Sequence, residues 1–512
     1  MTSGTWEKPY SYSFMKPLVF PFNIKLAEPS SSDKRADKER LIEEISTRLN
    51  TSLPIDLCLK TLRKLPVFLR ENNFSAFAVI SHTDKNIMIL DVRNDDRIYA
   101  VVIDIGTTNL AASLYNMKTS EKICSLEHEN PQVTLGLDVL TRVHLAMAGK
   151  ADELHKLLID GLNSLIKKLC ESSGVAYSDI YAGVIAGNTI MSHFFANLNV
   201  SNIPIEPYIP TCHKFGFLKA SELGINIHPE SLIYIYPNAG SYVGGDIISG
   251  ILSSGIYKDE LPSLLIDVGT NAEIVLGCKD WMLVGAGAAG PALESGISEI
   301  GMRAIDGAIY SVTIEKDCEV KIKTIGNKEP IGVCGSGMIE LISEMFQAGI
   351  INRQGKFQKK CPSIVEQNGN RGFLIYNSGS KTLIIYDHDI ENFLRSKAAM
   401  FTFLYVLTRS VGMRFKDIHR VYISGAFGGG INAEKAVRIG MIPAIDKSKI
   451  IALGNSSLKG TEMLLRNSDL LTDIDSICKL ITYKEMNTES EFMKEFPGAL
   501  FIPHTNPEVL KA

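Results

Sequence analysis

Two stretches of the chain repeat one pattern, and this duplication constrains the fold more than any other feature. Residues 101–110 read VVIDIGTTNL, and residues 264–273 read LLIDVGTNAE. In each stretch an apolar, strand-like run ends in Asp-X-Gly-Thr, and the residues that follow turn apolar again. We therefore expect two related half-domains that each present one such turn to the phosphates of a single nucleotide.

The residue types in both turns suit phosphate binding. Glycine has no Cβ, so the backbone can turn sharply and approach a phosphate group closely. Backbone amides and hydroxyl groups after the glycine can then donate hydrogen bonds to phosphate oxygens. The candidate cofactor-binding residues of the two turns are Gly106, Thr107, Thr108, Gly269, Thr270 and Asn271. A pair of ordinary β-hairpins with glycine turns is the alternative interpretation.

Aspartates in these motifs are the candidate catalytic residues. Asp104 and Asp267 end the first run of each repeat, where a carboxylate can hold Mg²⁺ through a bound water. Two carboxylates that face one polyphosphate can also position an attacking water. Asp246, at the end of the segment YVGGD, would act as a general base or hold a water near magnesium. A helix-capping role explains Asp246 equally well.

A third glycine-rich segment suits the adenosine part of a nucleotide. Residues 421–430 read VYISGAFGGG, and a helix-like run follows Asn432. A strand, a glycine turn and a capped helix form an edge where adenosine can lie against bare backbone. The candidate residues are Gly425, Gly428 and Gly429.

Two further glycine-rich segments have less specific patterns. Residues 333–338, VCGSGM, open a predicted helix, where backbone amides can bind a ribose or a phosphate. The candidate residues there are Gly335, Ser336 and Gly337. Residues 285–294, GAGAAGPALE, allow close approach of a large flat ligand or a partner protein. Tight packing of a helix on a sheet explains that segment as well.

Local patterns divide the chain into four segments. Residues 1–36 contain four prolines and a serine run, which is typical of an extended linker. Residues 37–97 predict a small α+β domain. Beyond them, short β-branched runs alternate with amphipathic stretches, as in a layered α/β domain. We assign residues 98–265 to a first lobe and residues 266–512 to a second.

Hydrophobic periodicity predicts individual elements within these segments. Helices are expected at residues 37–49, 54–71, 151–172, 333–349 and 387–412. Strands are expected at residues 77–80, 86–91, 180–185, 261–266 and 421–424.

The composition of the chain excludes several classes of protein. The formal net charge of −4 leaves no overall basic excess for nucleic-acid binding. We find no run of 18 apolar residues and no signal-peptide pattern, which predicts a cytoplasmic protein without a membrane partner. The nine cysteines are scattered, and no pair has C-x-x-C spacing. We therefore expect reduced thiols and no iron–sulfur cluster in this chain.

The order of the motifs resembles the superfamily of acetate and sugar kinases, heat-shock chaperones and actin. Residues 104–108 match its first phosphate motif, residues 267–271 its second and residues 425–429 its adenosine motif. The resemblance implies an α/β fold with two ribonuclease-H-like lobes around a Mg·ATP cleft, preceded here by the small α+β domain. Hinge closure on ATP is the usual output of such a fold.

A narrower resemblance, to the reductive activators of corrinoid proteins, runs through residues 99–500. It rests on segments in a fixed order: NPQ at 130–132, GLDV at 136–139, GNT at 187–189, PY at 207–208, VGGD at 243–246, DVGTN at 267–271, AAGPA at 288–292, GMRA at 301–304, CGSG at 334–337, GAFG at 425–428 and GN at 454–455. Residues 37–97 lie where that family has its small middle domain, and residues 1–36 resemble the linker before it.

This resemblance implies an ATP-dependent activator of a corrinoid protein in a methyltransferase system, with ATP and Mg²⁺ as cofactors. In the family, ATP drives release or rearrangement of a tight complex with the corrinoid protein. An iron–sulfur domain supplies the electron that converts Co(II) to methylatable Co(I). The present sequence begins at the linker, so we expect a separate, ferredoxin-like electron donor. Formation of a homodimer is left open.

Other functions on the same fold also remain open. A small-molecule kinase would use Asp246 as its base, and an ATP-binding regulatory protein would bind ATP with negligible turnover. An activator of the 2-hydroxyacyl-CoA dehydratase kind would use Cys334 as a cluster ligand, although a lone cysteine beside a strand is more typical of a buried core.

Overall fold

The computed structural model describes residues 16–269, 272–287, 298–315, 318–358, 361–367, 369–425, 432–484 and 490–510. The chain divides into two compact units, Met1–Ser249 with Ser457–Cys478 and Gly250–Ser456 with Lys479–Ala512. It passes from one unit to the other three times: inside helix α6 (Gly245–Ser254), at the start of helix α11 (Ser456–Arg466) and near the end of helix α12 (Leu470–Leu480). The second and third passages were not part of the domain boundaries that we predicted from the sequence.

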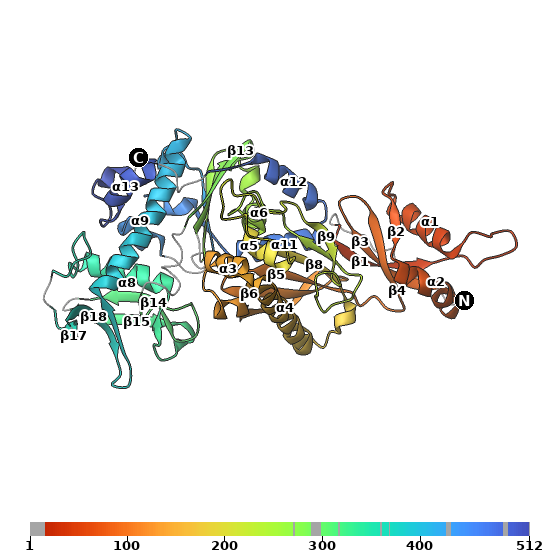
Figure 1. Cartoon of the computed structure of the whole chain (residues 1–512), viewed down its shortest axis with the longest axis horizontal. Helices are drawn as coiled ribbons and strands as arrows, with labels where there is room; N and C mark the ends of the chain where they lie inside the picture. Colours follow the sequence, from red (N-terminus) through yellow and green to blue (C-terminus); the bar gives the residue numbers. More distant parts are fainter. Residues whose placement is uncertain are drawn as a thin grey trace, which may run out of the picture. The chain divides into compact units, whose positions relative to one another are not determined.

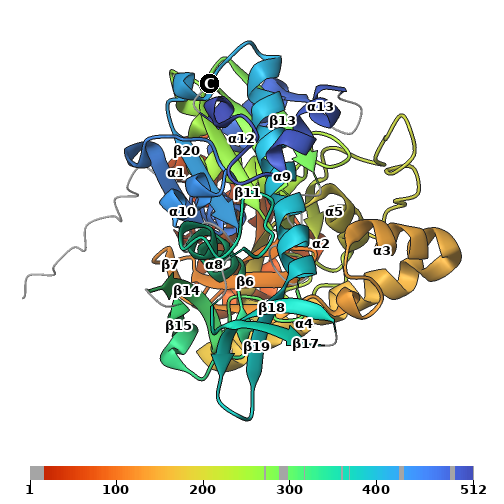
Figure 2. The same cartoon turned by 90° about the vertical axis from the view of Figure 1, so that its left-hand side faces the viewer.

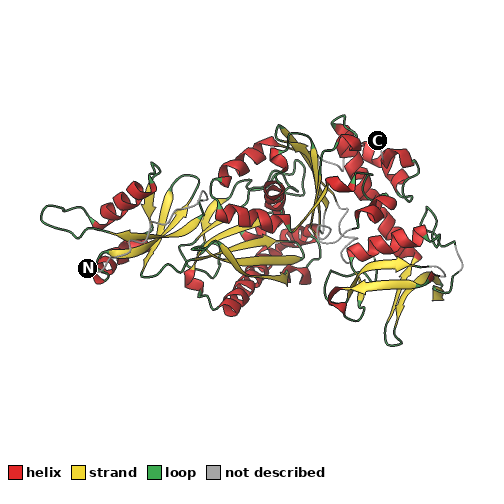
Figure 3. Cartoon of the chain, turned by 180° about the vertical axis from the view of Figure 1, so that it is seen from behind, coloured by secondary structure: helices red, strands yellow, loops and turns green. Residues whose placement is uncertain are grey.

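Unit 1 begins with a small α+β domain. Its elements are β1 (Val19–Lys25), α1 (Asp37–Leu49), β2 (Ile55–Leu57), α2 (Leu59–Glu71), β3 (Ser75–His82) and β4 (Ile87–Arg93), whose strands and helices are distinguished by colour in Figure 3. The strands form one sheet in the order β1-β3-β4-β2, in which β2 is parallel to β4 and the other pairs are antiparallel. Both helices share a hydrophobic core with this sheet.

Two expectations for this domain require correction. Residues 19–25, which we assigned to a linker-like segment, form β1 at the edge of the sheet, where Pro21 is tolerated because an edge strand leaves one side of its backbone unpaired. The helix expected at residues 54–71 begins only at Leu59, since Ile55–Leu57 pairs with β4. The helix expected at residues 37–49 is confirmed as α1.

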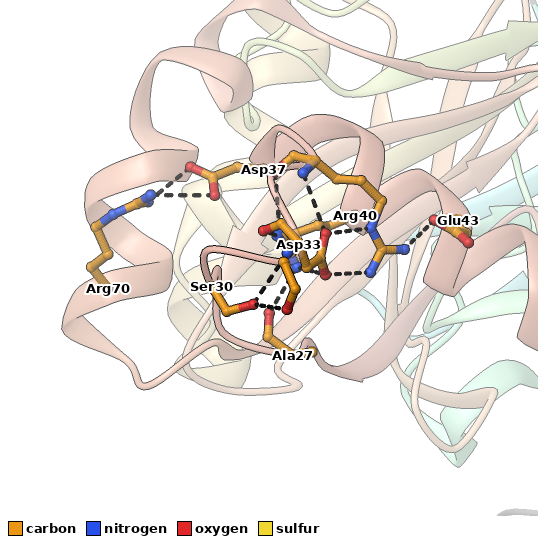
Figure 4. Close-up of polar contacts among 9 residues, drawn as sticks. Ala27, Ser30, Asp33, Asp37, Arg40, Glu43 and Arg70 are labelled. Carbon is orange, nitrogen blue, oxygen red and sulfur yellow. Dashed lines mark hydrogen bonds and ion pairs between the residues drawn. The ribbon is translucent and has the colours of Figure 1, made fainter.

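The segment between β1 and α1 is anchored by an ion-pair network (Figure 4). The buried guanidinium group of Arg40 donates to the carboxylate and to the backbone carbonyl of Asp33, both at 2.6 Å, and to the carbonyl of Ala27 at 3.3 Å. Hydrogen bonds from Arg35, and then from Arg40, hold the pKa of Asp33 well below its usual range. This proline- and serine-rich segment therefore has defined contacts with the small domain.

The rest of unit 1 is a six-stranded sheet with helices. Its strands are β5 (Tyr99–Ile105), β6 (Asn109–Asn116), β7 (Glu121–Glu129), β8 (Ile180–Gly187), β9 (Gly216–Lys219) and β10 (Leu232–Ile235), in the order β7-β6-β5-β8-β10-β9. The helices include α3 (Val139–Leu145), α4 (Ala151–Ser173), α5 (Thr189–Phe195) and α12 (Leu470–Leu480). Helix α4 runs along the sheet and shares its core (Figure 1).

Unit 2 contains a second six-stranded sheet in the order β21-β20-β11-β12-β13-β22. These strands are β11 (Ser263–Val268), β12 (Ala272–Cys278), β13 (Trp281–Gly287), β20 (Val421–Gly425), β21 (Ile450–Gly454) and β22 (Ile481–Tyr483). Two three-stranded sheets accompany it, built from β14 (Ala308–Ile314), β15 (Val320–Thr324) and β16 (Gly332–Val333), and from β17 (Ile364–Gln367), β18 (Asn370–Asn377) and β19 (Thr382–Tyr386).

Helices accompany these sheets in the described part of unit 2. They are α8 (Gly335–Gln347), α9 (Asp387–Ser410), α10 (Ala433–Arg438) and α13 (Ser490–Ala499). Helices α9 and α13 pack against each other, as both views show (Figures 1 and 2). The elements that we expected at residues 151–172, 180–185, 261–266, 333–349, 387–412 and 421–424 are confirmed, with bounds shifted by two residues or fewer, as α4, β8, β11, α8, α9 and β20.

The described residues include no helix with the length and apolar character that crossing a bilayer requires.

Candidate functional site

The two Asp-X-Gly turns lie at equivalent points of the two large sheets. The turn after β5 leads into antiparallel β6, and parallel β8 flanks β5 on its other side. In the same way, β11 is followed by antiparallel β12 and flanked by parallel β20. Both turns do close β-hairpins, as the alternative interpretation held, but each hairpin also carries a parallel third strand. The duplication seen in the sequence is therefore a duplication of the fold.

Loop 1, defined here as residues 104–108, is held by side chains from outside the motif. The amide Nδ2 of Asn130 donates to the carbonyl of Gly106 at 2.9 Å, and its backbone N–H donates to the carbonyl of Thr108 at 2.8 Å. Asn188, at the start of α5, donates to the hydroxyl of Thr107 at 3.2 Å. These bonds fix the turn in one conformation.

Arg142 of α3 is a further support of loop 1. Its fully buried guanidinium group donates to the carbonyl of Thr107 at 2.6 Å, to the carbonyl of Gly136 at 2.8 Å and to Oε1 of Gln132 at 3.0 Å. Burial lowers the pKa of Arg142 to about 10, so the group stays charged at neutral pH. A buried cation with several acceptors is costly to remove, because each acceptor then loses its donor.

The carboxylate of Asp104 accepts a hydrogen bond from the hydroxyl of Ser457 at 2.8 Å. Asp246 lies in the first turn of α6, where its Oδ1 accepts the backbone N–H of Ile247 at 2.8 Å. A Cβ on Gly244 would collide with the backbone of Asn188. The segment that leads to Asp246 therefore packs against a support of loop 1.

Loop 2, defined here as residues 267–271, is described at residues 267–269. The hydroxyl of Ser424 in β20 donates to Oδ2 of Asp267 at 2.8 Å and lies 2.5 Å from the hydroxyl of Ser456. Gly425 has a φ of 75°, and a Cβ there would lie 2.5 Å from Oδ1 of Asp267. The end of β20 therefore needs glycine to fit against the aspartate.

Several predicted residues lie outside the described part of the chain. They are Thr270, Asn271, Gly428, Gly429 and residues 288–297 of the GAGAAGPALE segment. The structure does bring Asp267 and Gly425 together in unit 2, and Asp104 and residues 106–108 together in unit 1.

The CGSG segment opens α8, as expected, on the sheet that contains β14. Gly335 begins the helix, and a Cβ on Gly337 would collide with the carbonyl of Ile309 in β14. Cys334 is buried, with its Sγ 3.3 Å from the same carbonyl and 3.3 Å from the hydroxyl of Ser336. Close packing therefore accounts for Gly337, and a core position accounts for Cys334.

Helix α10, which follows the adenosine motif, is fixed to α8 by charged side chains that are half-buried or buried. Asn432 caps the helix by accepting the backbone N–H of Lys435 at 3.3 Å. The ammonium group of Lys435 pairs with Glu340 at 3.1 Å and with Glu344 at 3.2 Å, and it donates to the carbonyl of Val312 at 2.9 Å. These contacts set the position at which the chain leaves the glycine turn.

Among the residues that the structure describes, no group of three or more histidine, cysteine, aspartate or glutamate side chains is close enough to hold a metal ion. Mg²⁺ is usually held by one or two carboxylates, with waters and substrate phosphates as its other ligands. Asp104 in unit 1 and Asp267 in unit 2 are each a half-buried carboxylate at the end of a strand, which is the type of ligand that such a site uses. None of the nine cysteines forms a disulfide bond.

Sequence reasoning missed five residues that support these loops. They are Asn130, Arg142, Asn188, Ser424 and Ser457. Two of them stood in the NPQ and GNT segments, which carried the family resemblance without an assigned role. A charged residue such as Arg142 on an amphipathic helix gives no local sign that it will be buried.

Comparison with known proteins first defines the class of the chain. Residues 261–512 match the model of the C-terminal domain of RACo, described as the ASKHA domain. Residues 99–259 match the RACo middle region and residues 13–97 the RACo linker region. The small domain at residues 37–97 therefore lies in the linker region of that family, and not in its middle region as we expected. The chain is therefore a mixed α/β protein with an ASKHA domain, which a smaller domain precedes.

Individual relatives then define the family. The chain is 30% identical over 415 residues to the corrinoid activation enzyme RamQ of Eubacterium limosum, which covers 78% of this chain and 69% of RamQ. It is 26% identical over 427 residues to the [Co(II) methylated amine-specific corrinoid protein] reductase of Methanosarcina barkeri, and this match covers 75% of this chain and 73% of that protein. A solved reductive activator for corrinoid,iron-sulfur protein is similar at a TM-score of 0.91 and 34% identity, over 98% of this chain and 82% of that one. The chain belongs to this family, the reductive activators of corrinoid proteins.

Proposed function

We propose that this protein is an ATPase that activates a corrinoid protein of a methyltransferase system by supporting reduction of Co(II) to Co(I). The observation that carries the proposal is the match of three consecutive family regions over residues 13–512, in a chain whose two large sheets repeat the same Asp-X-Gly turn. The relatives named as corrinoid activation enzyme and corrinoid protein reductase support the same activity.

The proposed ligand of the repeated turns is ATP with Mg²⁺. Gly106, Thr107 and Thr108 of loop 1, and Gly269, Thr270 and Asn271 of loop 2, would donate to its phosphates. Gly425, Gly428 and Gly429 would contact adenosine, and residues 335–337 a ribose or phosphate. Asp104 and Asp267 would hold Mg²⁺, which when bound offsets the phosphate charge. Asp246 would hold a water beside them.

The proposed use of ATP follows from the energetics of the reaction. Reduction of Co(II) to Co(I) in a protein is uphill for cellular donors, so binding energy from ATP must alter the complex between activator and corrinoid protein. The electron itself needs a carrier. We propose a separate, ferredoxin-like donor in the cytoplasm, because the cysteines of this chain are scattered and none is disulfide-bonded.

Visible absorption spectroscopy tests the proposal directly. A Co(II) corrinoid protein is mixed with this protein, Mg·ATP and a low-potential chemical reductant, and the spectrum of Co(I), or of methyl-cobalt after addition of a methyl donor, is followed. We expect the Co(I) or methyl-cobalt signal to grow with ATP and not with a non-hydrolysable analogue. If ATP increases neither signal with any reductant, the proposed function is wrong.

A further inference from the structure

Helix α2 of the small domain has an apolar face on each side. Thr61, Leu65 and Leu69 point into the core of the domain. On the opposite side, Leu59 is 59% exposed and Val67 is 60% exposed. Leu62 and Pro66 are exposed as well. Residues at positions i, i+3, i+7 and i+8 share one helical face, so these four side chains form an outer stripe, with Arg63 at position i+4 between Leu59 and Val67.

The outer stripe is bordered by basic residues. The helix contains one acidic residue, Glu71, and four basic residues, Lys60, Arg63, Lys64 and Arg70. It therefore carries a positive net charge, although the formal net charge of the whole chain is −4. Lys64 is paired with Asp91 and Arg70 with Asp37 at 2.8 Å, the latter drawn in Figure 4. Within the described residues, no ion pair joins Lys60 or Arg63 to a carboxylate. These two exposed charges are therefore available to a partner.

The size of this surface indicates a transient contact. A helix of 13 residues is about 20 Å long, so one of its faces covers far less area than a stable complex buries. Small, short-lived interfaces of this kind are typical of electron-transfer partners. In them, complementary charge mainly raises the association rate, and a few apolar contacts at the centre are sufficient.

We propose that the outer face of α2, defined by Leu59, Lys60, Leu62, Arg63, Pro66 and Val67, is the docking surface for an acidic protein that carries one low-potential electron. This inference rests on the proposed function, which requires such a donor. In the step concerned, the reduced carrier gives up one electron and is oxidised, and Co(II) of the corrinoid protein accepts it and becomes Co(I). The electron is thus accounted for without a redox group in the described residues of this chain.

The test compares two electron sources with one pair of variants. Co(I) formation is measured at saturating Mg·ATP and corrinoid protein, first with titanium(III) citrate and then with a reduced, acidic two-cluster ferredoxin at increasing concentration. The test variant is K60E/R63E. Its matched control is K156E/K168E, which reverses two exposed basic residues on α4 of the same unit. The charge-preserving variant K60R/R63K and thermal melting of all variants report on folding.

We expect K60E/R63E to raise the KM for ferredoxin by roughly tenfold or more at low ionic strength, with the rate at saturating ferredoxin unchanged. The salt dependence of that KM should weaken, and the titanium-driven rate should equal that of wild type. The proposal is wrong if K60E/R63E and K156E/K168E raise the KM for ferredoxin equally, or not at all. It is also wrong if K60E/R63E raises the KM for the corrinoid protein with both reductants. Failure of wild type with titanium citrate would instead overturn the proposed function.

Discussion

Loop 1 and loop 2 have the same motif and the same place in their sheets, but different supports. Loop 1 is braced through its backbone carbonyls by Asn130 and the buried Arg142, which lie on segments after the hairpin. The described support of loop 2 reaches its aspartate side chain through Ser424 of the neighbouring strand, as the hydroxyl of Ser457 reaches Asp104 in loop 1. The duplication has thus kept the motif, while the surrounding residues of each copy have diverged.

The two glycines of the motif show the same contrast. A Cβ on Gly106 would lie 2.6 Å from the carbonyl oxygen of Asn109, whereas no atom of the described residues lies within 4 Å of a Cβ on Gly269. Gly106 is therefore required by the hairpin itself, and Gly269 leaves room that a ligand can use. We infer that substitutions around loop 1 act mainly on folding, and substitutions in loop 2 mainly on nucleotide chemistry.

Arg142→Met should have the largest effect and should act on stability. Methionine fills much of the same volume but leaves the carbonyls of Thr107 and Gly136 without their donor. Each buried acceptor left without its hydrogen bond costs about 1–3 kcal/mol, so the two carbonyls together should lower the unfolding free energy by about 2–6 kcal/mol. Denaturant titration of wild type and variant measures this loss, and Arg97→Met, at an exposed arginine, is the matched control. A loss below about 1 kcal/mol would mean that loop 1 does not depend on this brace.

Asp267→Asn should have the next largest effect, and this effect should be on the rate of ATP hydrolysis. The amide keeps the shape of the side chain and an acceptor for the Ser424 hydroxyl, so the fold should be spared. Loss of the charge should lower the rate constant of ATP hydrolysis by about 10²–10³-fold, as is usual when a positioned electrostatic group is removed. Steady-state phosphate release measures it.

Asp104→Asn is the companion of this variant in loop 1. Equal losses in the two variants would mean that the repeats have kept equivalent chemistry despite their different supports. Hydrolysis near the wild-type rate in Asp267→Asn, with a normal melting temperature, would remove loop 2 from the catalytic machinery.

Much of this arrangement was predictable from sequence because it is local. The repeat, the helix at residues 37–49 and the capped helix after Asn432 all follow from patterns within about fifteen residues. What could not be predicted depends on distant partners. Residues 19–25 form a strand only because β3 is there to pair with it, and Ile55–Leu57 leaves the expected helix to join β4. Arg142 looks like an ordinary surface arginine until Thr107 and Gly136 are placed around it.

Gly106→Ala and Gly269→Ala form a matched pair that tests the contrast between the loops at the motif itself. We expect Gly106→Ala to lower stability by about 1–3 kcal/mol, since the added methyl group meets backbone that must move. Gly269→Ala should leave the melting temperature unchanged and weaken ATP binding, because the methyl group takes up space beside the phosphates. Thermal melting and ATP titration by calorimetry measure the two effects. Equal destabilisation in both variants would contradict the proposed difference.

Ser424→Ala and Ser457→Ala should have the smallest effects, and they separate the two aspartates most finely. Each removes one hydroxyl donor, to Asp267 or to Asp104, and a hydrogen bond to a carboxylate is worth about 1.5–3 kcal/mol at most. In Ser424→Ala we expect the hydrolysis rate to fall by about tenfold with little change in KM for ATP, because Asp267 loses its described support. The hydrolysis rate should fall less in Ser457→Ala, since the buried hydrogen bonds of Asn130 and Arg142 still hold loop 1. Steady-state kinetics of the two variants measures the difference, and a larger loss in Ser457→Ala would reverse the assignment of the better-braced loop.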